Sequence, residues 1–132
     1  MLPNRFRISQ RATETLKQIK GRSGVTPNIL CRMALVLSLR EGRQAAAQRI
    51  ELDGSEFNTP TLFGDYPLVY ESLIRQVHGP LDGKEIQRVV AAHIDAGVDQ
   101  LKRVRRLGDL LTFAPNAPAK GRSHGEAKLS AI

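Results

Sequence analysis

Residues 29–39 are apolar on nearly every face of the helix that they predict, and this limits the folds open to the chain. Thr26-Pro27 supplies an N-cap and a first-turn proline before the run, and Gly42 supplies a stop after it. A helix that is apolar all round must be covered all round. A chain of 132 residues offers little to cover it with, so we expect a mainly α-helical domain that forms a homo-oligomer around this helix.

Residues 5–9 alternate between polar and apolar side chains, which predicts a short strand. Arg5 and Arg7 lie on one face of this strand, and Phe6 and Ile8 lie on the other. A lone strand is not stable in water, and the rest of the chain has few strong strand signals. We therefore expect the strand to pair with the same strand of a second subunit.

A helix-turn-helix pair is predicted to follow the strand. Ser9 supplies the N-cap of the first helix, and its apolar stripe leaves Lys17 and Lys20 together on the opposite side. These lysines either meet a phosphate backbone or form an ordinary solvated face. Gly21 and Gly24 end the helix, since glycine adopts the left-handed angles that a tight joint needs. The stripe expected in the core is Ala12, Thr15, Leu16 and Ile19.

An ordered loop over residues 44–64 and two further helices complete the expected domain. The third helix spans about residues 67–77. The fourth begins at about Lys84 and keeps its apolar phase across Gly97, where it either continues or breaks. The positions expected in the core are Phe57, Leu62 and Phe63 in the loop and Val69, Leu73 and Val77 in the third helix.

The composition indicates one domain and a tail. Residues 1–113 are long enough for a single modest core. Residues 114–132 are rich in Ala, Pro, Gly and Ser, which cannot bury enough surface to offset the entropy of ordering, so we expect them to be disordered.

Charge is distributed unevenly along the chain. The formal net charge is +7, but residues 1–49 contain ten Lys or Arg and two Glu, whereas residues 50–82 contain six acidic residues and one Arg. This pattern fits a surface that binds a polyanion, or a subunit that docks its acidic part on a neighbour. Basic residues at 102, 103, 105 and 106 either extend a DNA footprint or simply cap the last helix.

No pattern of catalytic or metal-binding residues stands out. Cys31 is the single cysteine, so an internal disulfide is excluded, and it reads as a small core residue in a cytoplasmic protein. The N-terminus lacks the apolar stretch of a signal peptide, and no apolar run approaches the roughly 20 residues that span a bilayer. His93 lies on an apolar stripe and reads as a core histidine, since His78 and His124 are distant in sequence. We expect neither enzymatic activity nor a metal or cofactor.

Several short motifs occur in order along residues 1–111. They are Leu2-Pro3-Asn4-Arg5, the turn from Gly21 to Gly24, Thr26-Pro27-Asn28-Ile29, Glu56-Phe57-Asn58, Thr61-Leu62-Phe63-Gly64 and Ala92-His93-Ile94. In this order and together they resemble the DndE family of bacterial DNA phosphorothioation, a modification in which sulfur replaces a non-bridging oxygen of the DNA backbone.

The resemblance implies a small helical protein with a strand and helix pair like the ribbon-helix-helix fold. It implies a homotetramer that binds double-stranded DNA and prefers nicked duplex. The role is accessory, because a cysteine desulfurase, an adenylating iron–sulfur protein and an ATPase are separate chains and potential partners. The predicted DNA-binding residues are Arg5, Arg7, Arg11, Lys17, Lys20, Arg22, Arg32 and Arg40, and the predicted oligomer contact is Gly21, Arg22, Ser23 and Gly24.

Two other functions remain open on the sequence. A ribbon-helix-helix transcriptional regulator would use Arg5, Arg7 and Ser9 on paired strands to read base edges in the major groove of an operator. A scaffold would dock the other modification proteins through the acidic residues 50–82 and would bind DNA weakly by itself.

Overall fold

The computed structural model describes residues 2–41 and 47–103, and residues 1–102 form one compact unit. The expectations for residues 105, 106 and 114–132 lie outside the described residues. None of the described helices is long and apolar enough to cross a membrane. The elements in chain order are β1 (Arg5–Arg7), α1 (Gln10–Ser23), α2 (Pro27–Arg40), the 3-10 turn η1 (Ala47–Arg49), β2 (Glu56–Asn58), α3 (Thr59–Phe63), α4 (Pro67–His78) and α5 (Gly83–Lys102).

The helix-turn-helix pair forms as the sequence predicts. The Ser9 hydroxyl accepts a hydrogen bond from the backbone N–H of Ala12 at 3.0 Å, which satisfies one of the free donors at the start of α1. Gly24 ends α1 with a φ of 78°, and its N–H donates to the Lys20 carbonyl. Pro27 then opens α2. Gly24 therefore caps the end of α1, whereas Thr26 precedes α2 without a capping hydrogen bond from its side chain.

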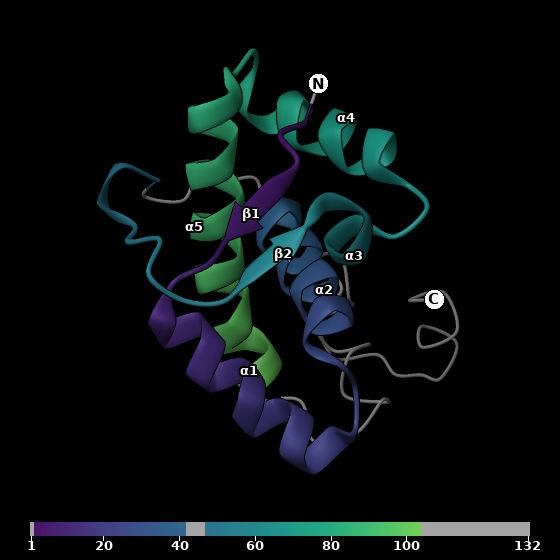
Figure 1. The fold of residues 1–132 in the computed structure, drawn as a ribbon, viewed down its shortest axis with the longest axis vertical. Coiled ribbons are helices and arrows are strands. Elements are labelled where there is room, and N and C mark those ends of the chain that lie inside the picture. The colour runs from purple at the N-terminus through teal and green to yellow at the C-terminus, as the bar shows by residue number, and fades with distance from the viewer. Residues whose placement is uncertain (1, 42–46, 104–132) are drawn as a thin grey trace, which may run out of the picture. The chain divides into compact units, whose positions relative to one another are not determined.

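Helices α2 and α5 lie side by side and form the centre of the core (Figure 1). Helix α5 runs unbroken through Gly97, which is buried against the backbone of Ala34 in α2. A side chain at position 97 would overlap that backbone, so glycine allows the two helices to approach closely. The sequence left open whether the last helix continues through Gly97 or breaks there, and the structure shows that it continues.

Helix α2 is covered mostly by its own chain. Leu30, Ala34 and Leu35 are at most 2% exposed, and α1, α3, α4 and α5 all pack against the helix. Ile29, at 41% exposure, is its large apolar side chain most open to solvent. Four other helices of the same chain therefore enclose most of α2, and the homo-oligomer expected from this helix stays a prediction.

The two short strands pair with each other. β1 and β2 are antiparallel, with Phe6 opposite Phe57 and Arg7 opposite Glu56. The partner of β1 is therefore a strand about fifty residues further along the same chain, and not the same strand of a second subunit as predicted. Phe6 and Phe63 meet edge to face with ring centroids 5.3 Å apart, which anchors the ribbon and α3 to the core.

Helix α4 packs through a different stripe from the predicted one. Val69 and Leu73 are 53% and 38% exposed, whereas Ile74 is fully buried. Tyr70, one turn before Ile74, stacks on Phe63 at 5.1 Å between ring centroids. The helix is apolar on two adjacent sides, so periodicity alone could not select between them, and the position of Phe63 decides which side faces the core.

Candidate nucleic-acid interface

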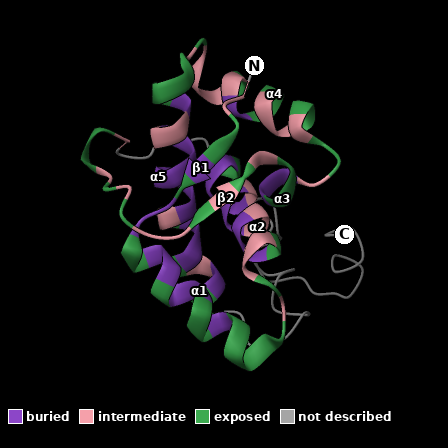
Figure 2. Cartoon of the chain, in the orientation of Figure 1, coloured by how far each residue is buried: buried purple, intermediate pink, exposed green. Residues whose placement is uncertain are grey.

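Helix α1 presents its basic side chains to solvent. Its inner face is buried through Ala12, Leu16 and Ile19, and its outer face is exposed along the whole helix (Figure 2). Lys17 and Lys20 lie on that outer face, and their side chains form no hydrogen bond or ion pair with any described residue. Both ammonium groups are thus open to solvent, and their contact with a phosphate backbone stays a prediction.

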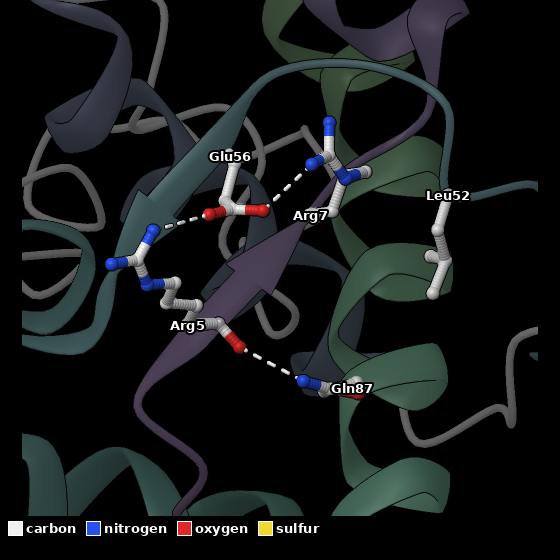
Figure 3. A pocket seen from close by; sticks show the side chains of 5 residues that line it. All are labelled: Arg5, Arg7, Leu52, Glu56 and Gln87. Atoms are coloured by element: carbon white, nitrogen blue, oxygen red, sulfur yellow. Dashed lines mark hydrogen bonds and ion pairs between the residues drawn. The ribbon is translucent and has the colours of Figure 1, made fainter.

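The β1–β2 ribbon holds its two arginines on a single carboxylate. Arg5 donates to one Glu56 oxygen at 2.9 Å, and Arg7 donates to the other at 2.7 Å (Figure 3). These contacts hold the pKa of Glu56 below its usual value, the hydrogen bond from Arg5 contributing most. Beside them lies an open hollow of about 190 Å³ that Leu52 and Gln87 also line. The amide of Gln87 in α5 donates to the Arg5 carbonyl at 3.0 Å.

Arg11 connects α1 to α5. Its guanidinium lies 3.0 Å from a carboxylate oxygen of Asp95 and 3.0 Å from one of Asp99. The Ser9 hydroxyl donates to the same Asp95 at 2.6 Å. These hydrogen bonds, first Asp99 and then Asp95, raise the pKa of Arg11 above its usual value. Arg11 is therefore neutralised within the chain, which favours a structural role over the predicted contact with DNA.

Two further predicted arginines donate to backbone carbonyls. Arg22 donates to the Lys102 carbonyl at 2.5 Å, at the C-terminus of α5, where a cation also suits the helix dipole. Arg32 donates to the carbonyls of Leu62 and Thr61 at 2.7 and 3.1 Å. A carbonyl leaves the net charge of an arginine in place, so Arg32 still contributes to a positive potential.

Arg40 lies at the end of α2 and is exposed, with no bonding partner among the described residues. Of the eight predicted DNA-binding residues, only Arg40, Lys17 and Lys20 have side chains without such a partner. These three residues come from two helices. Among the eight predicted residues, they are the cations most available to a ligand.

His93 is a core histidine, as predicted, but it has a histidine partner. Its Nε2 lies 2.7 Å from Nε2 of His78, and its Nδ1 lies 2.7 Å from the Ser38 hydroxyl. Burial, with a smaller effect of His78, lowers the pKa of His93 to about 4. The His78–His93 pair was not predicted from the sequence, because fifteen residues and a turn separate the two histidines.

Cys31 is buried, and burial raises the pKa of its thiol to about 12, which agrees with a small core residue. Across residues 2–41 and 47–103, no three or more His, Cys, Asp or Glu side chains group in a way that could hold a metal ion.

Comparison with known proteins decides the family. Residues 5–108 match the family model described as DNA sulphur modification protein DndE. The chain belongs to the DndE family. The crystal structure of DndE from Escherichia coli B7A, described as involved in DNA phosphorothioation modification, superposes with a TM-score of 0.69 at 31% identity, over 74% of this chain and 97% of that one. No curated protein sequence matches this chain at a significant level.

A second DndE crystal structure draws attention to the turn between α1 and α2. It is the G21/24K mutant, described as involved in DNA phosphorothioation, and it superposes with a TM-score of 0.68 at 29% identity, over 76% of this chain and 99% of that one. This DndE-family chain also has glycine at positions 21 and 24. A Cβ added at either position would meet nothing within 4 Å. Packing within the chain therefore does not explain Gly21, which has an ordinary helical φ.

Glu56 and Gln87 lie beside Arg5 and Arg7, and the predicted DNA-binding set contains neither of them. A sequence signal for Glu56 existed, because Glu56-Phe57-Asn58 alternates in the same way as Arg5-Phe6-Arg7. Pairing two such strands puts the glutamate beside the arginines. Gln87 had no comparable signal, since its contact is with a backbone carbonyl.

Proposed function

We propose that this chain is an accessory DNA-binding protein of a bacterial DNA phosphorothioation system. It binds double-stranded DNA, prefers nicked duplex, and acts as a homo-oligomer in the cytoplasm. Membership of the DndE family is the observation that carries this proposal, together with similarity to a DndE described as involved in that modification. The sulfur chemistry itself belongs to partner proteins of the system, and this chain needs no cofactor for its role.

Unpaired cations on α1 and α2 support the binding of DNA. Lys17, Lys20 and Arg40 are repeated on every subunit, so an oligomer presents several such sets to one duplex. Each phosphate that they neutralise releases condensed counterions, which makes affinity fall steeply with salt. Contacts to phosphate carry no direct sequence information, so we expect binding without a defined operator.

A rigid arrangement of the basic residues Lys17, Lys20 and Arg40 across the subunits accounts for the proposed preference for nicked DNA. Smooth bending of intact DNA over a site of 20–30 base pairs costs about 1–6 kcal/mol, depending on the angle. A nick interrupts one strand and lowers that cost. If the basic positions of an oligomer do not follow a straight duplex, the nicked form binds more tightly because less deformation energy opposes the contacts.

Two features support a homotetramer. Leu68 is 74% exposed on α4, with Tyr66, Val69 and Leu73 beside it in sequence and also exposed. Apolar side chains gathered on one element favour burial against protein. The open space around Gly21 at the α1–α2 turn permits another chain to approach closely there. Either surface alone supplies one contact, and a closed tetramer with dihedral symmetry needs more than one.

The scaffold function is the second candidate, and the exposed apolar side of α4 favours it. The acidic residues that it was expected to use are largely engaged within the chain. Glu56 binds two arginines, and Asp53 accepts a hydrogen bond from the N–H of Gln10 at 2.8 Å. Docking through α4 would survive charge reversal at Lys17 and be lost on Leu68→Glu. The regulator alternative loses support, since β1 has its partner within the chain and both its arginines bind Glu56.

Charge reversal at single lysines tests the proposed function. Lys17→Glu and Lys20→Glu are each expected to weaken binding to random-sequence duplex about tenfold at physiological salt, and to reduce the slope of log affinity against log salt by about one. Lys84→Glu is the matched control, because Lys84 is exposed on α5, has no described bonding partner, and undergoes the same change of charge. Equal losses in all three variants would indicate a general effect of net charge and contradict the assignment.

A further inference from the structure

Glu56 occupies both arginines of the ribbon at the same time. Each of its carboxylate oxygens accepts a hydrogen bond from a different guanidinium. The side chains of Arg5 and Arg7 are nevertheless 72% and 46% exposed, against 31% for Glu56. One anionic group thus lies between two cationic groups that remain open to solvent, and the cluster keeps a net positive charge.

The arginines have donors to spare. Arg5 donates to described residues only through Nη1, and Arg7 uses Nη1 for the Gly54 carbonyl and Nη2 for Glu56. A guanidinium presents five N–H groups in a planar fork that matches carboxylate and phosphate oxygens alike. The hollow beside Glu56 is lined by both arginines and Gln87, and its volume of about 190 Å³ is ample for a phosphate group.

The ribbon is held firmly enough to present these groups in a fixed geometry. Gly54 packs its backbone against Ser9 and Thr13 at the start of α1, where no side chain would fit. Gln87 ties the Arg5 carbonyl to α5. The two arginines therefore emerge from a backbone anchored to two helices, and only their side chains need to move when the bound anion changes.

We infer that Arg5, Glu56 and Arg7 form a phosphate subsite of the DNA-binding surface, in which the Glu56 carboxylate takes the place of a DNA phosphate when the protein is free. This inference rests on the proposed function and deepens it. On binding, a phosphodiester group enters the hollow, the two guanidinium groups transfer their hydrogen bonds to its oxygens, and Glu56 turns to solvent. Glu56 thereby lowers the affinity of the ribbon for DNA but does not block the subsite.

The exchange is feasible because the contacts that it breaks are weak. Ion pairs this exposed contribute little to stability in water, and salt screens them. A DNA phosphate brings the additional gain of counterion release, which a single carboxylate on the same chain lacks. Glu56 therefore competes measurably but does not win against duplex DNA at moderate salt.

Glu56→Gln tests the subsite. The amide keeps the size of the side chain and removes its charge, so we expect about three- to tenfold tighter binding to random-sequence duplex, the range that two exposed ion pairs allow. The salt slope should steepen by up to about one, because a negative charge no longer lies beside the contacted phosphate. Asp65→Asn is the matched control, because Asp65 is exposed, has no described partner and makes the same change of net charge. Equal gains in both variants would overturn the inference.

If the inference holds, the extra DNA affinity of Glu56→Gln depends on Arg5 and Arg7. In a Glu56→Gln background, replacement of Arg5 and Arg7 by Gln should abolish the extra affinity and return the salt slope to the wild-type value or below. A gain that persists without the arginines would overturn the inference, and so would a loss of affinity in Glu56→Gln with the protein still folded by thermal melting. Wild-type protein that binds no DNA would instead refute the proposed function, so the two failures are distinguishable.

Discussion

The carbonyl of Ala34 in α2 faces Gly97 in α5 at a distance that leaves no room for a side chain. This contact lies where the two central helices of the fold pack together. Glycine at position 97 thus weakens α5 as an isolated helix, by roughly 1 kcal/mol relative to alanine, but permits the packing that organises the core.

Gly97→Ala is expected to destabilise the protein by roughly 3 kcal/mol or more, because backbone must shift to accommodate the methyl group. Chemical denaturation followed by circular dichroism measures the loss. Gly83→Ala on the same helix is the control, since a Cβ there meets nothing within 4 Å. Comparable losses in the two variants would contradict the close approach of α2 and α5.

The His78–His93 pair predicts that stability falls in mild acid. The pKa of His93 is lowered to about 4, well below its unfolded value near 6.5. The folded state therefore binds fewer protons, so this contribution is fully present above pH 6.5 and is lost as the pH falls toward 4. The full linkage amounts to about 3 kcal/mol. Unfolding free energies between pH 7.5 and 4.5 should show this slope, and His93→Gln should flatten it.

Arg11→Gln should lower stability and leave DNA binding nearly intact. The change removes the link from Arg11 to Asp95 and Asp99, which we expect to cost about 1 kcal/mol because the pairs are half exposed. Lys17→Gln, with the same change of charge, should show the opposite pattern of weaker DNA binding and unchanged stability. A reversed pattern would return Arg11 to the DNA-binding set.

Gly21→Lys separates folding from assembly. A lysine at position 21 enters open space on a helix and favours helical conformation over glycine by up to roughly 1 kcal/mol, so the monomer fold should persist. If the turn lies at a subunit contact, sedimentation should show a smaller species than the wild type. An unchanged oligomer together with a raised melting temperature would place the contact elsewhere. Gly24→Lys is a less clean test, because the φ of 78° at Gly24 strains any other residue.

The parts of the fold that sequence could predict are those set by neighbours in the chain. Ser9, Gly24 and Pro27 define helix ends through groups within four residues of each, and the apolar phase across Gly97 follows from helical periodicity. The basic outer face of α1 follows from the same periodicity, and the exposure of Lys17 and Lys20 confirms it.

The remaining features depend on contacts between distant segments. The pairing of β1 with β2 joins residues about fifty apart, so the engagement of Arg5 and Arg7 by Glu56 could not be read from either segment alone. A count of charges along the sequence does not distinguish one arginine from another. In the fold, tertiary contacts neutralise the charge of Arg11, whereas the side chain of Arg40 stays available to a ligand. The buried side of α4 was mistaken for the same reason, since only the position of Phe63 selects it.

The most direct test of the proposed function is a titration of the purified protein against nicked, intact and single-stranded DNA of one length and random sequence, repeated at several salt concentrations. We predict that the nicked duplex binds most tightly and that affinity falls steeply with salt for both duplexes. Equal affinity for nicked and intact duplex would remove the preference for nicks. Weak binding to all three, with little dependence on salt, would contradict the DNA-binding function and favour the scaffold.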